Sequence, residues 1–226
     1  MNLSYLQHLA DYSDGVLYAL AVLLLLALAV TLDRFWYLRR TILRGQRMVR
    51  DIGKQPALGA AELDMLRQRA GSLPEAALLS AALDYLDLPA EALAGRLDEA
   101  IMLLAPQIDR RMWLLDTIVT LAPLLGLFGT IIGMFHAFSV LATPGHAPVE
   151  VTAGVADALV ATASGIFIAM LGLAAFNALS DRVRQVLLQL DTVKTMVLNR
   201  VSVPPLRVAG GHAASTRALR AMAPGE

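Results

Sequence analysis

Residues 114–141 read LLDTIVTLAPLLGLFGTIIGMFHAFSVL. After Asp116, no formally charged side chain occurs until Glu150. The nineteen residues from Thr117 to Phe135 would extend about 28 Å as a helix, which matches the hydrocarbon thickness of a bilayer. The stretch therefore predicts a membrane-spanning helix over residues 114–141.

This span is rich in small residues for a helix that would face only lipid. Gly126, Gly129 and Gly133 follow the spacing i, i+3, i+7, so one helix face has no side chains and a neighbouring helix can approach it closely. Pro123 removes one backbone hydrogen bond and pushes on the carbonyl of Val119. These features favour a position inside a bundle of helices.

The composition of the chain supports a membrane protein. Of 226 residues, 57% are hydrophobic and 17% are charged, which is too apolar for an ordinary soluble domain. The formal net charge of zero argues against nucleic-acid binding. The sequence has no cysteine, which excludes disulfides, zinc–thiolate sites and thiol nucleophiles. No metal or other cofactor is expected, because the histidines lack metal-ligand spacing: His8, His136, His146 and His212.

Two further uncharged runs predict the other membrane spans. The first span, residues 16–33, is followed by the aromatic cluster Phe35-Trp36-Tyr37, which suits a membrane interface. The last span, residues 157–180, contains twenty-three consecutive uncharged residues from Ala158 onward. Its small-residue face consists of Ala161, Gly165, Ala169 and Gly172.

The predicted architecture is therefore all-α, with three membrane helices and long helical extensions. The segments between and beyond the spans are an outer amphipathic segment (residues 1–15), a helical region (residues 34–113) and an outer loop (residues 142–156). An amphipathic helix (residues 181–200) and a flexible tail (residues 201–226) follow the last span. Within the helical region, Ser72 and Glu75 have the spacing of a capping box. Pro106 is expected to bend the helix that leads into the central span.

Basic residues predict the orientation of the chain. All 19 Lys and Arg lie in two blocks, twelve between Arg34 and Arg111 and seven between Arg182 and Arg220. By the positive-inside rule, the helical region and the tail are then cytoplasmic. The N-terminus and the loop after the central span are outside.

Three polar residues of the hairpin formed by the second and third spans are candidate functional residues. Asp157 begins the third span, where an acid is costly unless it meets water or a partner, although the helix dipole equally favours an acid there. Thr130 and Thr162 each lie sixteen residues from His146, the expected turn, so we expect them at similar depth. Their hydroxyls either order water or bond back to their own helices. Asp157 and Thr162 lie about 140° apart around an ideal helix, so both cannot point at one axis.

Other chemistry finds less support in the sequence. Asp116, at the cytoplasmic mouth of the central span, is read as a solvated boundary acid. No ionisable side chain lies in the middle of any span, so a carrier for protons would have to come from water or from another chain. A membrane enzyme would need a nucleophile–base pair or a metal set, and neither is visible, so no enzyme is expected.

Two segments resemble a known family. APLLGLFGTIIGMFHAF (residues 122–138) and GVADALVATASGIFIAMLGLAAFNAL (residues 154–179) are similar to the paired membrane segments of the ExbB/TolQ/MotA proton-channel family. The run DRFWYLRR, beginning at Asp33, is similar to the stretch that follows the first span in that family. The length and the three-span layout resemble ExbB and TolQ more than the four-span MotA.

The resemblance implies a multi-pass protein of the bacterial inner membrane that forms a homopentamer around a dimer of a single-span, ExbD/TolR-like partner. A membrane aspartate of that partner would carry the proton, and the motor would drive a TonB- or TolA-type energy transducer. Thr130 and Thr162 match the pore threonines of the family, and Asp157 matches an acid that is usually Glu. The alternative is a non-conducting scaffold of the same architecture in the bilayer.

Overall fold

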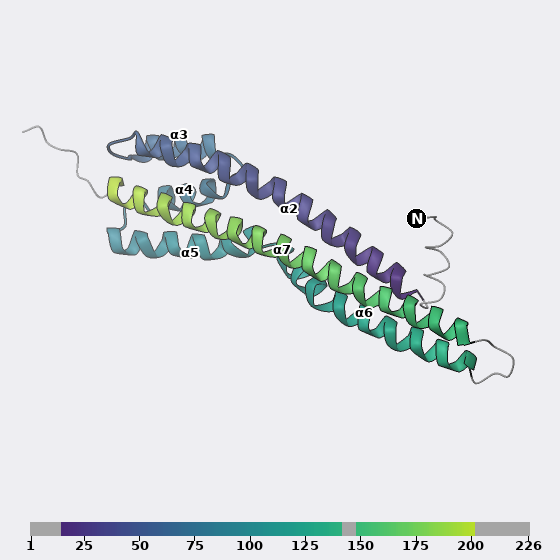
Figure 1. Ribbon diagram of the computed structural model, residues 1–226. Helices are drawn as coiled ribbons and strands as arrows, with labels where there is room; N and C mark the ends of the chain where they lie inside the picture. Colours follow the sequence, from purple (N-terminus) through teal and green to yellow (C-terminus); the bar gives the residue numbers. More distant parts are fainter. Residues whose placement is uncertain (1–14, 142–147, 202–226) are drawn as a thin grey trace, which may run out of the picture.

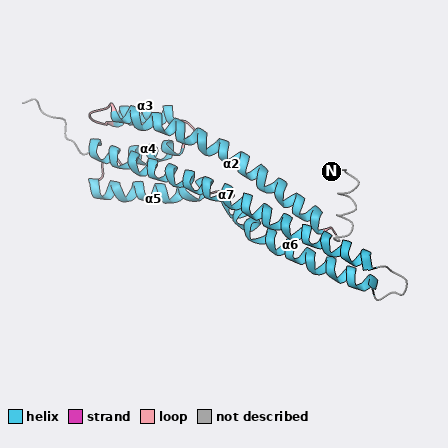
Figure 2. Ribbon diagram, viewed as in Figure 1, coloured by secondary structure: helices cyan, strands magenta, loops and turns pink. Residues whose placement is uncertain are grey.

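The computed structural model describes residues 15–141 and 148–201, and every regular element in these ranges is a helix (Figures 1 and 2). The all-α prediction is therefore confirmed. The outer amphipathic segment, part of the outer loop and the tail lie outside the described residues. The helices are α2 (Val16–Gly53), α3 (Ala60–Ala70), α4 (Pro74–Asp84), α5 (Ala90–Ile108), α6 (Met112–Leu141) and α7 (Pro148–Val201).

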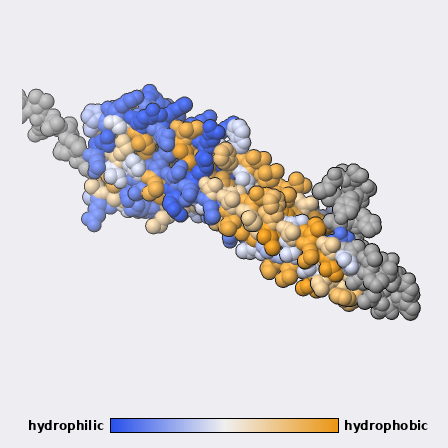
Figure 3. Space-filling view, in the orientation of Figure 1, coloured by the Kyte–Doolittle hydropathy of each residue, from blue (hydrophilic) through white to orange (hydrophobic). Residues whose placement is uncertain are grey.

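Three of these helices, α2, α6 and α7, are long and apolar enough to cross a membrane, which confirms the three-span prediction. Only 22–28% of their most apolar 18-residue windows is buried inside the chain. Large side chains such as Phe135 and Phe167 are more than half exposed, and one face of the molecule carries a broad apolar band (Figure 3). Lipid or other chains must cover this band in the membrane.

The helices α2 and α7 continue well beyond the apolar windows. α7 is one unbroken helix of 54 residues, about 80 Å long at 1.5 Å per residue. The far halves of α2 and α7, together with α3, α4 and α5, form the polar end of the molecule (Figures 1 and 3). We call this part, residues 34–108 and 181–201, the extramembrane body.

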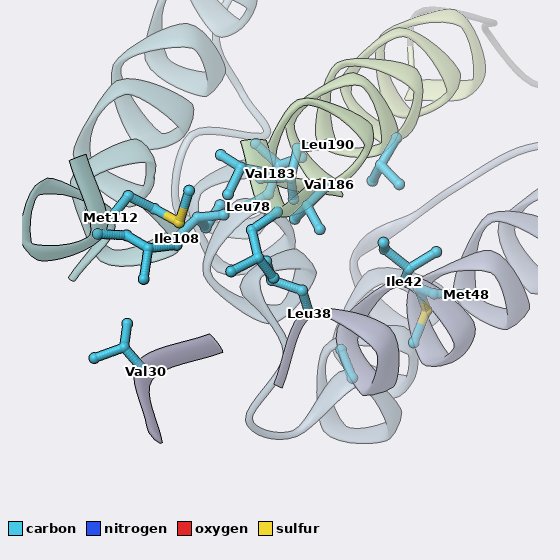
Figure 4. Packing of buried hydrophobic residues seen from close by; sticks show 14 of the residues in the cluster. Val30, Leu38, Ile42, Met48, Leu78, Ile108, Met112, Val183, Val186 and Leu190 are labelled. Carbon is cyan, nitrogen blue, oxygen red and sulfur yellow. The ribbon is translucent and has the colours of Figure 1, made fainter. Parts of the chain in front are cut away.

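The core of the extramembrane body is built where three helices meet. Leu38 and Ile42 of α2, Leu78 of α4, and Val186 and Leu190 of α7 are buried in one hydrophobic cluster (Figure 4). Each fully buried aliphatic side chain stabilises the fold by on the order of 1.5–3 kcal/mol. The cluster continues towards the spans, so the body and the membrane helices share one core.

The helix that leads into the central span ends rather than bends. Pro106 lies in the last turn of α5, which stops at Ile108, and α6 begins only at Met112. Between them Arg111 takes a left-handed conformation with φ 70°, which an α-helix cannot accommodate. Where the sequence predicts a bend at Pro106, the helix ends two residues later, and the left-handed Arg111 forms the turn into α6.

Two side chains of α2 hold this junction in place. Arg34, only 5% exposed, donates a hydrogen bond from its guanidinium to the carbonyl of Ile108 at the end of α5. Helix ends leave such carbonyls without an intrahelical donor, so Arg34 acts as a cap from another helix. The neighbouring Asp33 pairs with Arg111 at 2.7 Å. We call Asp33, Arg34, Ile108 and Arg111 the junction clamp.

The capping box predicted for Ser72 and Glu75 does not form. The N-cap of α4 is Leu73, and no side chain caps that helix end. Glu75 is fully buried instead, because it lies on the face of α4 that packs into the body. The related contact occurs at α3, where Glu62 accepts a hydrogen bond of 3.1 Å from the N–H of Gly59.

Candidate functional site

The small-residue faces of α6 and α7 meet in backbone contact. A Cβ atom added to Gly126 would lie 2.9 Å from the carbonyl oxygen of Ala161 and 3.2 Å from the Cα of Gly165. A Cβ on Gly165 would overlap the carbonyl oxygen of Ala122. No side chain fits between the two helices at this level, which is how glycine lets membrane helices pack closely.

The same contact continues towards the loop end of the hairpin, where α6 ends and α7 begins. A Cβ on Gly133 would lie 2.8 Å from the Cβ of Ala158. A Cβ on Gly129 would lie 2.8 Å from the Cβ of Ala161 and 3.0 Å from a methyl group of Val16, the first residue of α2. Gly129 therefore marks the place where all three spanning helices meet.

The other end of the hairpin is packed less tightly. A Cβ on Gly172 would lie 3.0 Å from a methyl group of Val119. Ala169, which the sequence places on the same face, is only partly buried. The close approach of the two helices is therefore centred on Gly126 and Gly165.

Thr162 forms a hydrogen bond across this contact. Its hydroxyl donates to the backbone carbonyl of Gly126 at 2.9 Å. The hydroxyl of Thr130 instead donates to the carbonyl of Leu127, one turn back in its own helix, at 2.7 Å. In a regular α-helix, the backbone N–H of Thr130 also donates to the Gly126 carbonyl, four residues earlier. The two threonines thus converge on one carbonyl, and in the part of the chain described here their hydroxyls do not bond to each other.

The two acids at the ends of the hairpin have different surroundings. Asp157 is partly exposed and precedes Ala158, whose methyl group packs on Gly133. It lies about 7.5 Å along α7 from Thr162, towards the N-terminal end of that helix. Asp116 is exposed near the start of α6.

The interior of the hairpin offers polar groups but no acid or base. Residues 117–135 of α6 and 158–180 of α7 contain no ionisable side chain. Within residues 15–141 and 148–201, no group of three or more potential metal ligands occurs. The two hydroxyls can order water or bind a polar group from another chain, because each keeps acceptor capacity, whereas the Gly126 carbonyl already accepts two hydrogen bonds.

Sequence reasoning missed two participants of this site. The Gly126 carbonyl is a backbone acceptor, and residue types give no signal for its orientation. Val16 reaches the hairpin only because α2 packs against Gly129, and no pattern in the sequence predicts which end of the first span makes this contact.

Comparisons with known proteins point to one family. Residues 71–192 match the MotA/TolQ/ExbB proton channel family, a range that includes α4, α5, α6 and the site residues of the α6–α7 hairpin. The chain is 32% identical over 150 residues to putative biopolymer transport protein ExbB-like 3 of Synechocystis sp., covering 65% of this chain and 71% of that protein. It is 30% identical over 173 residues to ExbB-like 1 of the same organism, covering 73% and 66%.

A shorter and stronger similarity is to the Tol-Pal system protein TolQ of Haemophilus influenzae. The identity is 40% over 80 residues, which is 35% of this chain and 35% of that protein. The chain thus matches about a third of the length of this TolQ.

Proposed function

Because this chain belongs to the MotA/TolQ/ExbB proton channel family, we propose that it is a proton-channel subunit of a bacterial inner-membrane motor. It is a multi-pass protein of that membrane. In this proposal the motor uses the proton-motive force to drive a TonB- or TolA-type energy transducer. The single observation that carries it is the glycine-lined hairpin, in which the Thr162 hydroxyl bonds across to the Gly126 carbonyl, one helical turn from Thr130.

The site requires a second chain to move protons. The hairpin interior holds hydroxyl and carbonyl groups at the level of Thr162 but no carboxylate, and hydroxyls do not exchange protons readily near neutral pH. A single-span partner with a membrane aspartate, of the ExbD/TolR kind, supplies the missing group. Thr130 and Thr162 then line its path, and Asp157 provides the acid at the outer mouth.

The exposed apolar surface supports a ring of subunits around such a partner. Most residues of the apolar windows point away from the chain, and lipid covers only the outer side of a ring. A homopentamer with the N-terminus outside and the C-terminus in the cytoplasm agrees with the resemblance and with the distribution of basic residues.

Proton flux into proteoliposomes tests this function. The chain is reconstituted with its single-span partner, and flux is followed with a pH-sensitive dye under an imposed potential. We expect flux from the wild type and at most a tenth of it from the double variant Thr162→Ala, Asp157→Asn. The matched control is Thr192→Ala, because the Thr192 hydroxyl bonds only to the carbonyl of Leu188 in its own helix.

Two outcomes would count against parts of the proposal. Wild-type flux in the double variant would refute the site assignment. An assembled wild-type complex that passes no protons, with or without the partner, would favour the non-conducting scaffold of the same architecture.

A further inference from the structure

Besides the Nε atom of Arg34, two side chains of the extramembrane body have buried polar atoms without a hydrogen-bond partner in the described part of the chain. Glu75 of α4 is 0% exposed, and both of its carboxyl oxygens have no hydrogen-bond partner within the described part of the chain. The Nε2 atom of Gln189 in α7 is also buried without a partner there. Buried polar groups are nearly always hydrogen-bonded, so two orphaned groups in one body need a physical reason.

The position of Glu75 on α4 places its carboxyl in the core. The residues three, four and seven positions later share its helix face, and all of them are fully buried. Glu75 therefore stands where an apolar residue would continue the buried stripe, and the extramembrane body cannot turn it towards water without rotating α4. These three residues are Leu78, Leu79 and Ala82.

A glycine makes room for Glu75 and Gln189 to meet. A Cβ atom on Gly45 of α2 would overlap both the Oε1 atom of Glu75 and the Nε2 atom of Gln189. The two polar groups thus lie over the same glycine and next to each other, at the point where α2, α4 and α7 converge. A small rotation of either side chain is enough to bring them to hydrogen-bonding distance.

The surroundings favour a neutral carboxyl. Burial raises the pKa of Glu75, and the nearby N–H of its own backbone, which makes no well-formed hydrogen bond to the carboxyl, opposes this only in part. No charged side chain is a cause of the shift. The ionisable residues on the neighbouring turns of the surrounding helices are Arg44, Arg47 and Asp51 of α2, Asp64, Arg67 and Arg69 of α3, Asp98 of α5, and Asp191 and Lys194 of α7.

We propose that Glu75 is a proton-binding site of the extramembrane body, occupied when α2, α4 and α7 are packed together. The neutral carboxyl pairs with the Gln189 amide: its O–H donates to the amide oxygen, and the amide N–H donates to the carboxyl C=O. This arrangement satisfies the orphaned groups on both side chains. When the proton leaves to bulk water, the remaining carboxylate has only the Gln189 amide N–H and no cation beside it in an apolar site, and α4 separates from α2 and α7 to hydrate it.

The sign of the pH dependence follows from the raised pKa. An unfolded glutamate ionises near its ordinary pKa of about 4.3, whereas packed Glu75 holds its proton to higher pH. The stabilisation from the neutral pair is therefore fully present below the unfolded pKa and is lost as pH rises through the folded pKa. The packing of α4 is closed at low pH and opens at high pH.

Thermal unfolding of the full chain in detergent or nanodiscs at a series of pH values between 5 and 9 tests this site. The variant Glu75→Gln keeps the shape but cannot ionise. The matched control is Glu91→Gln, because Glu91 is the second residue of α5 as Glu75 is of α4, but is exposed. We expect Glu75→Gln to raise the unfolding midpoint at the alkaline end by at least about 2 °C and to flatten its pH profile. Glu91→Gln should follow the wild type.

Hydrogen exchange of peptides from α4 provides a second, local measurement that needs no variant. After correction for the intrinsic rate, we expect protection of residues 74–84 in the wild type to fall as pH rises, while the core of α7 stays protected. Constant protection across this range, or a Glu75→Gln variant with the pH profile of the wild type, would overturn the proposal. Neither measurement involves proton flux, so its failure would leave the proposed channel function untouched.

Discussion

The hydroxyl of Thr162 and the carbonyl of Gly126 are joined by a 2.9 Å hydrogen bond that crosses from α7 to α6. The bond exists because Gly126 and Gly165 let the two backbones touch. A bulkier residue at either position would move the carbonyl out of reach of the hydroxyl. The packing face and the candidate proton path are therefore parts of one structure.

Two substitutions of Thr162 should distinguish the effect of its hydroxyl group on proton flux from the effect of its side-chain volume. Thr162→Ser keeps the donor and should retain most of the proton flux, whereas Thr162→Val keeps the shape and should lower flux at least tenfold. The lost bond should reduce stability by only about 0.6–1 kcal/mol, so the valine variant should still assemble. Flux in proteoliposomes and assembly by size-exclusion chromatography check this. Equal flux from the serine and valine variants would contradict a role for the hydroxyl.

Gly126→Ala should weaken the hairpin. The new methyl group would lie 2.9 Å from the Ala161 carbonyl, so the helices must move apart at a cost of about 1–3 kcal/mol. The control is Gly95→Ala in α5, where a Cβ meets nothing within 4 Å. That change should be neutral or stabilise the helix by about 0.5–1 kcal/mol. Thermal unfolding of both variants in the same detergent makes the comparison, and an equal midpoint would refute the close contact.

Loss of Arg34 should loosen the junction between α5 and α6. Arg34→Met keeps much of the apolar stem but leaves the Ile108 carbonyl without its donor, a loss of about 1–3 kcal/mol. Limited proteolysis should then cut faster at residues 109–111. Arg39→Met is the control, because Arg39 lies on the same helix and is exposed. If both variants are cut at the wild-type rate, the junction clamp does not hold this turn.

Gly45→Ala should disturb the extramembrane body at every pH. Its methyl group would overlap the side chains of both Glu75 and Gln189, and a buried methyl that forces such shifts costs about 1–3 kcal/mol. Gly53→Ala is the control, because its Cβ would make an ordinary contact of 3.4 Å with the flexible end of Met196. Denaturant titration of both variants checks the difference, and a neutral Gly45→Ala would show that the two polar groups are not confined.

The orientation can be tested by labelling, because the chain has no native cysteine. A membrane-impermeant maleimide should modify His146→Cys in intact spheroplasts. It should modify Gly95→Cys only after the membrane is opened. The reverse pattern would contradict the orientation predicted from the basic residues.

The membrane part of the fold follows from the sequence because its signals are local. Residues 117–135 and 158–180 lack ionisable groups, and such runs have few alternatives to spanning a bilayer. The equal distance of Thr130 and Thr162 from the expected turn also predicted that the two residues lie at similar depth. Their different hydrogen bonds could not be predicted, because these depend on how far the two backbones approach each other.

Glu75 shows where local patterns fail. Its spacing from Ser72 is typical of a capping box, but the same residue also lies on the buried face of α4, three positions before Leu78. Tertiary packing decided between the two roles. The sequence held a second signal, because Glu75, Leu78 and Leu79 have the spacing of one apolar stripe. A break in the helix at Arg111 carries no comparable signal, since arginine rarely adopts a left-handed conformation.

The uninterrupted helix α7 connects the membrane hairpin directly to the extramembrane body. Thr162 and Gln189 lie on one rod about 80 Å long, with neither proline nor turn between them. Tilting that rod by about 4° about its N-terminal end would displace the C-terminal end by about 6 Å. In the proposed motor, small motions of α7 beside the single-span partner would therefore become large ones tens of ångströms away.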